Sequence, residues 1–297
     1  MRFLKASSIA ISTVLTGIAV SVGQAFAGGL GQSEPWQLGL QKAASPSMYG
    51  IEDFHILLMW IITIITVFVG LLLLYVMFRF NEKKNPTPSK TTHNTMIEFV
   101  WTVVPILILV GIAIPSFRLL YLQRDIPKAD LTIKATGNQW YWGYEYPEHK
   151  TTDGEAISFD AIMKTDEERK EGDPRLLATD NAVVVPVNKV VKVVVTASDV
   201  LHAWTIPSFG AKIDAVPGRL NELWFKADKK GVYYGQCSEI CGKDHAFMPI
   251  EVRVVSDADF KKWVEETKTA GLETAQKNLV AKMNAGSKTR QIAKLKK

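Results

Sequence analysis

The chain has 297 residues, of which 47% are hydrophobic and 22% are charged, with a formal net charge of +5 at pH 7. This length leaves room for two structural parts, and this composition fits a folded protein. Much of the positive excess lies after Lys277, where no acidic residue follows. The net charge therefore does not indicate a basic surface on the folded part, and we do not expect a nucleic-acid partner.

The first 27 residues have the pattern of a secretory signal peptide. Arg2 and Lys5 give a basic start, an apolar run covers residues 9–20, and residues 25–27 read Ala-Phe-Ala, a small-x-small cleavage site. A third membrane helix is the alternative, but the run is short for a span and is interrupted by Ser and Thr. We expect export of the chain and removal of residues 1–27.

Two long apolar runs follow an external segment at 28–50, and they predict a transmembrane helical hairpin over 51–125. The spans cover about 54–78 and 97–122, and each exceeds the roughly 20 residues that cross a hydrocarbon core. The intervening loop carries four basic residues and one acidic residue, so the positive-inside rule places it in the cytoplasm. Both mature termini then lie on the external side.

Glu98 lies at the cytoplasmic mouth of the second span, and two interpretations of it stay open. It can be an interfacial carboxylate that reaches the headgroup region. It can also be a point of proton uptake, because ionisable groups near membrane depth often mark ion pathways.

From about residue 126 the pattern changes to short segments that are rich in β-branched and aromatic residues and separated by Gly, Pro, Asp and Asn. This spacing predicts an antiparallel β-sandwich or barrel over 126–256, with a solvated, charged excursion at 147–177. The C-terminal part, 257–297, is expected to start with an amphipathic helix at 257–270. The basic remainder is expected to be mobile.

One motif, GQCSEICGKDHAFMP, contains the only two cysteines, Cys237 and Cys241, followed by His245 and Met248, while His202 lies upstream. Thiolate, imidazole and thioether groups together favour copper. Gly and Pro residues indicate that the motif forms a loop at the rim of the sandwich. A structural zinc site and a simple disulfide in an oxidising compartment stay open, although zinc leaves Met248 unexplained.

This motif, the upstream DVLHAWTIPSFGAKIDAVPGR, the aromatic QWYWGYEY and the hairpin together resemble subunit II of the haem–copper cytochrome c oxidases. The resemblance extends from about residue 54 to 255. It implies a cupredoxin-like Greek-key domain in the periplasm, anchored in a bacterial inner membrane. It also implies subunit I as a partner, together with subunit III, and cytochrome c as the electron donor. The alternative function is a membrane-anchored copper-binding or assembly protein without electron relay.

The resemblance also implies roles for single residues. Trp140 would receive the electron from cytochrome c, and Glu98 would stand at the mouth of a proton channel. The Glu239 side chain would bind a magnesium or manganese ion at the boundary with subunit I, because a carboxylate suits a hard cation. Haem, oxygen reduction and proton translocation would belong to subunit I. The ligands of a binuclear copper centre would be His202, Cys237, the Glu239 carbonyl, Cys241, His245 and Met248.

The other histidines, His55, His93 and His149, match no ligand position and are expected to be ordinary loop or interfacial residues. Asp180 and Asp199 lie near the site in the sequence. Either could belong to an acidic surface that speeds the arrival of a basic cytochrome, or could be an ordinary loop carboxylate.

Overall fold

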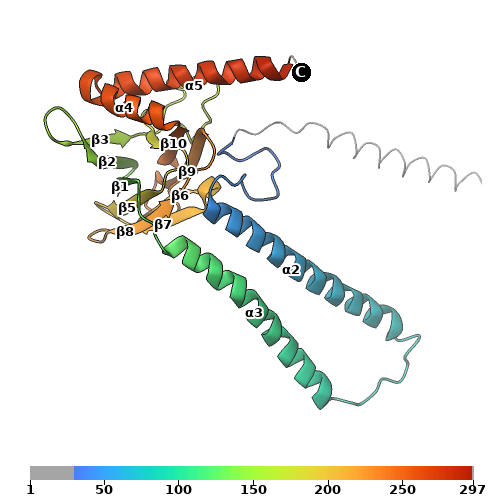
Figure 1. The fold of residues 1–297 in the computed structure, drawn as a ribbon. Coiled ribbons are helices and arrows are strands. Elements are labelled where there is room, and N and C mark those ends of the chain that lie inside the picture. The colour runs from blue at the N-terminus through green and yellow to red at the C-terminus, as the bar shows by residue number, and fades with distance from the viewer. Residues whose placement is uncertain (1–29, 296–297) are drawn as a thin grey trace, which may run out of the picture.

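The computed structural model describes residues 30–295, with side chains up to residue 285. Two long helices stand side by side and lead into a β domain, and a second pair of helices covers another side of that domain (Figure 1). The predicted signal peptide falls on residues 1–27, outside the described residues.

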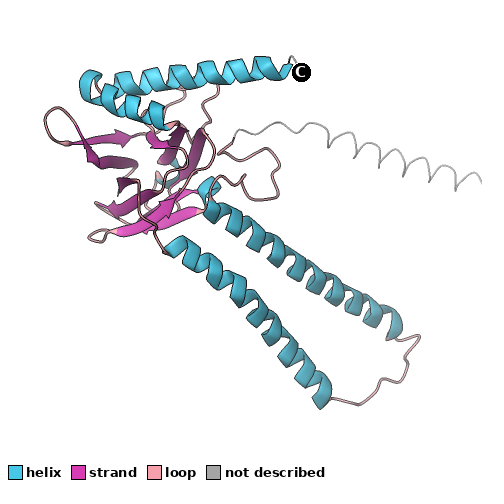
Figure 2. Cartoon of the chain, viewed as in Figure 1, coloured by secondary structure: helices cyan, strands magenta, loops and turns pink. Residues whose placement is uncertain are grey.

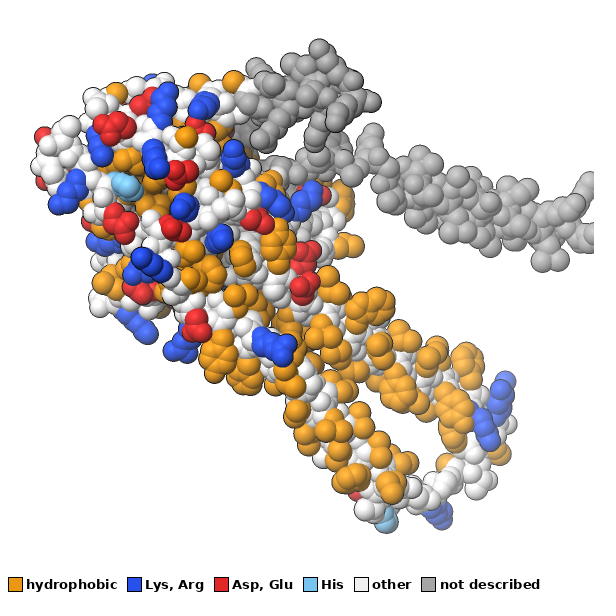
Figure 3. All heavy atoms as spheres, in the orientation of Figure 1, with side chains coloured by type: hydrophobic (Ala, Val, Ile, Leu, Met, Phe, Trp, Pro, Cys, Tyr) orange, Lys and Arg blue, Asp and Glu red, His pale blue; other side chains and the backbone are white. Residues whose placement is uncertain are grey.

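The two long helices are α2 (Pro46–Arg79) and α3 (Thr95–Arg124), and both are long and apolar enough to span a membrane. They extend past both ends of the predicted spans. The helix α2 begins early because the Ser45 side chain accepts a hydrogen bond from the Met48 N–H at 3.1 Å and Pro46 occupies the first turn. Apolar side chains cover the hairpin surface (Figure 3), as expected for helices surrounded by lipid or partner helices.

The start of α2 is fastened to the β domain. The Ser45 hydroxyl donates to the Phe209 carbonyl at 2.6 Å. One turn further along, the Tyr49 hydroxyl donates to Asp228 Oδ2 at 2.8 Å and accepts from Lys229 Nζ at 2.8 Å. Hydrogen bonds from two successive turns of the helix therefore hold the domain, so the two parts are not joined by a free linker.

The β domain contains two sheets and a two-stranded ribbon (Figure 2). The larger sheet has the strand order β3-β2-β1-β5-β8, the smaller one β4-β10-β9, and the ribbon pairs β6 with β7. The pairs β1–β5 and β4–β10 are parallel, and all other strand pairs are antiparallel. The predicted cupredoxin-like Greek-key class is confirmed. The expectation of a purely antiparallel sandwich was wrong, because parallel neighbours far apart in the sequence are joined by crossovers between the sheets. The strands are β1 (Leu131–Asn138), β2 (Tyr141–Lys150), β3 (Ala156–Ala161), β4 (Val183–Pro186), β5 (Val191–Ala197), β6 (His202–Ile206), β7 (Ala211–Ala215), β8 (Asn221–Phe225), β9 (Gly231–Gln236) and β10 (Pro249–Val255).

Burial alternates along β1 and β5, so one face of the larger sheet points into the sandwich. Large aromatic side chains, among them Trp142 and Trp204, fill the space between the layers. Cys237, Cys241 and Met248 belong to the same buried cluster. The predicted metal ligands are therefore set into the end of the core, not on a detached loop.

The short β-branched and aromatic segments of the sequence form strands, as predicted. The sequence pattern did not predict the strands β3, β6 and β7. The strand β3 lies inside the stretch that was predicted to be a solvated, charged excursion, and it pairs with β2. Its buried residues Ile157 and Ala161 face the core, so this part of the prediction was too broad.

The helix α4 (Asp257–Ala270) confirms the predicted amphipathic helix. The prediction of a mobile basic remainder was wrong, because Leu272–Leu295 forms a further helix, α5. Ala275 and Leu279, one turn apart, are buried against the domain. Gln276 Nε2 donates to the Ala182 carbonyl at 2.7 Å. Apolar and polar contacts therefore both hold the start of α5.

Candidate metal centre

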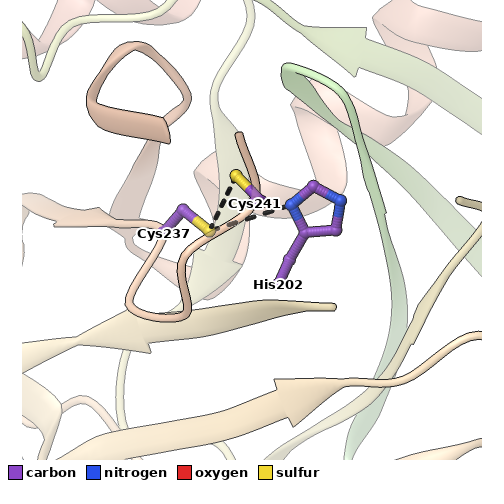
Figure 4. Close-up of side chains that lie close together, drawn as sticks. All are labelled: His202, Cys237 and Cys241. Carbon is purple, nitrogen blue, oxygen red and sulfur yellow. Dashed lines mark hydrogen bonds between the residues drawn. The ribbon is translucent and has the colours of Figure 1, made fainter. Parts of the chain in front are cut away.

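Two segments of the chain, the start of β6 and the connection between β9 and β10, bring the predicted ligands to one end of the sandwich. His202 is the first residue of β6, and Cys237 follows directly after β9. Cys241 lies in the following loop, His245 begins the short helix η2 (His245–Phe247), and Met248 precedes β10. Between the end of β9 and the start of β10 the motif is irregular except for that single turn, so the predicted loop is confirmed. His202 and the two cysteines face one another (Figure 4).

The closeness of β9 and β6 depends on a glycine. A Cβ atom on Gly235 would lie only 1.7 Å from the carbonyl oxygen of Thr205. No other residue fits this crossing without moving a strand. Three residues after Gly235, the Ser238 N–H donates to the Ala203 carbonyl at 3.1 Å. The crossing therefore places Cys237, directly before Ser238, beside the start of β6.

Each thiol has one imidazole beside it. Cys237 Sγ lies 3.8 Å from His202 Nδ1, and Cys241 Sγ lies 3.4 Å from His245 Nδ1. The two sulfurs are 3.9 Å apart, which is far longer than the roughly 2.05 Å of a disulfide bond. Because a metal–thiolate bond is about 2.3 Å long, one ion can reach both sulfurs.

Two weaker donors complete the group. Met248 Sδ lies 3.5 Å from Cys241 Sγ, and the Glu239 carbonyl oxygen lies 3.3 Å from Cys237 Sγ. All six predicted ligand groups are therefore adjacent to a cysteine sulfur. The Glu239 carboxylate has no hydrogen-bond or ion-pair partner among the side chains described up to residue 285.

The site is closed to solvent on its inner side. The exposed fraction is 0% for His202, 5% for Cys237, 3% for Cys241 and 1% for Met248. His245 is partly exposed. The thiols and the His202 imidazole are therefore shielded from water. Binding of a metal ion would release the protons of the thiols and satisfy these buried polar groups.

The pKa values of the two thiols are shifted in opposite directions. Burial opposes ionisation of Cys237, but its hydrogen bonds with His202 and the loop backbone outweigh burial and lower its pKa. Burial, reinforced by the charge of Cys237, raises the pKa of Cys241. Burial also opposes protonation of His202, yet its bonds to Cys237 and Asp199 raise its pKa. Without a cation, the pocket therefore accommodates one thiolate readily and a second with difficulty.

Trp142 in β2 lies directly beneath the site. Its indole Nε1 donates to the Met248 carbonyl at 3.3 Å, and its ring meets the His202 ring edge-on with centroids 6.0 Å apart. Gly137 in β1, the cross-strand partner of Trp142, also lies against this imidazole, because a Cβ on Gly137 would approach the ring to 2.7 Å. The His202 ring therefore packs against neighbouring positions of β1 and β2. The sequence predicted no role at the site for Trp142.

The turn between β1 and β2 reaches over the ligand loop. Trp140 Nε1 donates to the Cys241 carbonyl at 3.2 Å, and Gln139 Nε2 donates to the same carbonyl at 2.8 Å. The ammonium of Lys243 lies 5.7 Å from the centroid of the Trp140 ring, within reach of a cation–π interaction. Trp140 is therefore in direct contact with the backbone of a predicted ligand.

Two of the remaining candidates lie away from the site. Glu98 is in the first turn of α3, where its Oε1 accepts from the Asn94 N–H at 3.1 Å, so it helps to cap the helix. Asp180 accepts from the Ile162 and Asn181 N–H groups at 2.7 and 2.6 Å, as an ordinary loop carboxylate does. His149 packs between the Tyr146 and Phe260 rings.

Asp199, considered above for a docking surface, instead contacts the site. Its Oδ1 lies 2.9 Å from His202 Nε2, and its Oδ2 accepts from the Gln139 N–H at 2.7 Å. Sequence reasoning did not single out Gln139 at all. The only available signal was its position directly before Trp140, because the partners of Gln139, Asp199 and Cys241, lie 60 and 102 positions away in the chain.

Comparison with known proteins relates both parts of the chain to one family. The family model described as "Cytochrome C oxidase subunit II, periplasmic domain" matches residues 131–255, and its transmembrane-domain counterpart matches 33–119. "Probable cytochrome c oxidase subunit 2" of Rickettsia bellii is 51% identical and aligns over 86% of this chain and 89% of its own. Cytochrome c oxidase subunit 2 of Cereibacter sphaeroides is 46% identical over 80% and 83%.

Among solved structures, the crystal structure of the periplasmic domain of subunit II of cytochrome oxidase (CoxB) of Bradyrhizobium japonicum is 59% identical. It covers 49% of this chain and 99% of its own, with a TM-score of 0.44.

Proposed function

Because this chain belongs to the cytochrome c oxidase subunit II family, we propose that it is the subunit that accepts electrons from cytochrome c. The arrangement of six donor groups around two buried sulfurs carries the proposal. Oxygen reduction to water and proton translocation would take place with haem in the partner subunit I. Fast acceptance of single electrons needs metal ligands that stay in place, and the ligand groups of this site are held at the end of the core.

The donors suit a binuclear copper centre. Cys237 and Cys241 would bridge the ions, and each imidazole, from His202 or His245, would supply one strong donor. The buried thioether of Met248 distinguishes copper from zinc, because a soft sulfur ligand is expected for copper. When bound, the copper pair takes up and releases one electron at a time, with the change in charge spread over two ions. The protein positions the donors and excludes water.

The last ligand would come from Glu239 through its carbonyl oxygen, which lies beside the Cys237 sulfur. Its carboxylate is free of partners within the described side chains. We therefore assign it to a magnesium or manganese ion at the boundary with subunit I, since hard divalent cations prefer oxygen ligands.

Trp140 would be the point at which an electron from cytochrome c reaches the centre. Its indole contacts the Cys241 carbonyl directly, so it provides a short covalent and hydrogen-bonded route to a bridging sulfur. Electrons would then pass to haem in subunit I. The partly exposed Trp140 ring is also available to a docked protein.

The hairpin would lie in the bacterial inner membrane beside subunit I, with subunit III also in the complex. Its connecting loop is basic and would face the cytoplasm. Both mature termini and the β domain would then lie in the periplasm. The exposed apolar faces of α2 and α3 are suited to lipid and partner helices.

We predict that Glu98→Gln slows proton uptake by at least tenfold, ~1.4 kcal/mol in activation free energy, and leaves the copper spectrum unchanged. Glutamine retains an oxygen that can accept from the Asn94 N–H, so the helix cap survives while the charge is lost. Stopped-flow measurement of proton uptake by the assembled oxidase checks this. Glu52→Gln, in the first turns of α2, is the control. Normal uptake by the variant would leave Glu98 with capping alone.

Electron paramagnetic resonance of the whole chain, purified in detergent and loaded with copper, tests the proposed function. We expect the hyperfine pattern of one unpaired electron shared equally by two coppers. A pattern from a single copper would favour a copper-binding or assembly protein without electron relay. Failure to bind copper after full reduction of both cysteines would reject both functions.

A further inference from the structure

A single turn, between β1 and β2, contacts both halves of the candidate metal centre. We propose that Gln139 and Asp199 are positioning residues: together they hold His202 and the Cys241 backbone in the ligand arrangement before metal arrives. This inference rests on the proposed function, because it assigns these residues to the same copper centre. Neither residue is itself placed among the ligands.

The first contact fixes the His202 imidazole. Its Nε2 lies 2.9 Å from Asp199 Oδ1, while its Nδ1 lies 3.8 Å from Cys237 Sγ. Because a carboxylate only accepts, Nε2 must carry the proton and donate it. The lone pair of the neutral ring is then on Nδ1, on the side of the sulfur. A carboxylate in this position sets both the tautomer and the orientation of a ligand histidine.

The second contact fixes the carboxylate itself. Asp199 Oδ2 accepts from the Gln139 backbone N–H at 2.7 Å, and Oδ1 also accepts from the Val200 N–H at 2.6 Å. Both carboxylate oxygens are thus engaged by donors from the backbone or from His202. An aspartate held in this way cannot rotate without breaking several bonds at once.

The third contact joins the turn to the other half of the centre. Gln139 Nε2 donates to the Cys241 carbonyl at 2.8 Å. One continuous hydrogen-bonded path therefore leads from His202 through Asp199 and Gln139 to Cys241. Its two ends are predicted ligands that belong to different segments, 39 residues apart in the chain (241 − 202).

The turn is itself fixed by its strands. The Ser198 N–H donates to the Gly137 carbonyl at 3.0 Å, and Ser198 Oγ donates to Asn138 Oδ1 at 2.5 Å. Gly137 and Ala197 are paired in the parallel β1–β5 ladder. The loop that carries Asp199 and the turn that carries Gln139 are therefore bonded to each other independently of any metal.

Loss of this path should loosen the site without unfolding the domain. We expect Gln139→Ala and Asp199→Ala to weaken copper binding by about 10- to 100-fold, the range found when such outer partners of metal ligands are removed. Asp199→Asn should recover part of this loss, because its amide oxygen can take the place of Oδ1 and accept from His202, while its NH2 group cannot accept from the Gln139 N–H. Gln139→Glu should behave like alanine, since a carboxylate cannot donate to the Cys241 carbonyl.

The matched control is Asp130→Ala. Asp130 precedes β1 at the opposite end of the strand, and its Oδ2 accepts from the Val190 N–H, 60 positions on, at 2.9 Å. It thus makes the same kind of long-range carboxylate–backbone bond as Asp199, far from the ligands. If the Asp199 variant weakened copper binding only by destabilising the fold, Asp130→Ala should weaken it equally.

The experiment measures copper affinity of the full chain in detergent by competition with a chelator, with electron paramagnetic resonance of each loaded variant. Thermal unfolding of the metal-free variants is measured in parallel. Support is weaker binding and altered hyperfine splitting in Gln139→Ala and Asp199→Ala, with partial rescue by Asp199→Asn and no change in Asp130→Ala. Equal affinity and spectra in all variants would overturn the positioning role. Absence of the shared-copper spectrum in the unaltered chain would instead reject the proposed function.

Discussion

Replacing Cys237 with serine is expected to abolish the shared copper centre. A hydroxyl does not ionise near neutral pH and is a poor ligand for a soft metal, so one of the two bridges is lost. The Cys237 sulfur lies 3.8 Å from His202 Nδ1 and 3.3 Å from the Glu239 carbonyl oxygen. Without it, these two groups have no thiolate beside them to complete a metal site. We expect copper affinity to fall by at least 100-fold, ~2.7 kcal/mol, and the two-copper hyperfine pattern to disappear.

Cys241→Ser should have the same effect, because each sulfur is the centre of half of the donor set. Ser238→Ala, in the same loop, is the control, since its hydroxyl only reaches the Gln236 carbonyl at 3.2 Å. Electron paramagnetic resonance with copper quantification reads out all three variants. A two-copper pattern that survives either cysteine change would contradict the bridging assignment.

Replacing Trp140 with glutamine should separate copper binding from electron acceptance. The ligands stay in place, because Gln139 still donates to the Cys241 carbonyl. The aromatic ring that a donor protein can reach is removed, however, together with its bond to that carbonyl. We expect acceptance from reduced cytochrome c to slow by tenfold or more, at least ~1.4 kcal/mol in activation free energy, with an unchanged copper spectrum.

Stopped-flow mixing of the assembled oxidase with reduced cytochrome c measures this rate. Trp36→Phe is the control, since the Trp36 side chain is 98% exposed and lies in the segment before α2. An unchanged rate in the Trp140 variant would remove Trp140 from the route. Loss of copper in the same variant would show that the ring is needed for the site itself.

The proximity of the predicted ligands could be inferred because their signal is largely local. Cys237, Cys241, His245 and Met248 lie within one motif of unusual donor chemistry, and only His202 had to be added from elsewhere. The resemblance to a known family supplied the Glu239 carbonyl, which leaves no trace in a side-chain pattern. The apolar runs likewise identified the hairpin, since membrane spans are constrained by length and composition.

The supporting contacts were not predictable in this way. Gln139 and Asp199 are common polar residues, and only the pairing of β1 with β5 brings them together. The strand β6 is buried at almost every position, so it has no alternation of apolar and polar residues that would mark it in the sequence. The tail was misjudged for a different reason: its basic residues suggested a solvated chain. Burial of Ala275 and Leu279 one turn apart instead holds the start of a helix.

The firm attachment of α2 to the β domain has a mechanical consequence. The apolar part of this helix, about residues 54–78, is roughly 38 Å long at 1.5 Å per residue and so exceeds a hydrocarbon core of about 30 Å. Helices that exceed the local bilayer thickness respond by tilting. Because Ser45 and Tyr49 bond the first turns of this helix to the domain, tilt of the helix rotates the whole domain with it. The tilt of α2 in the bilayer would thus set the orientation of the β domain, and with it the direction in which Trp140 faces.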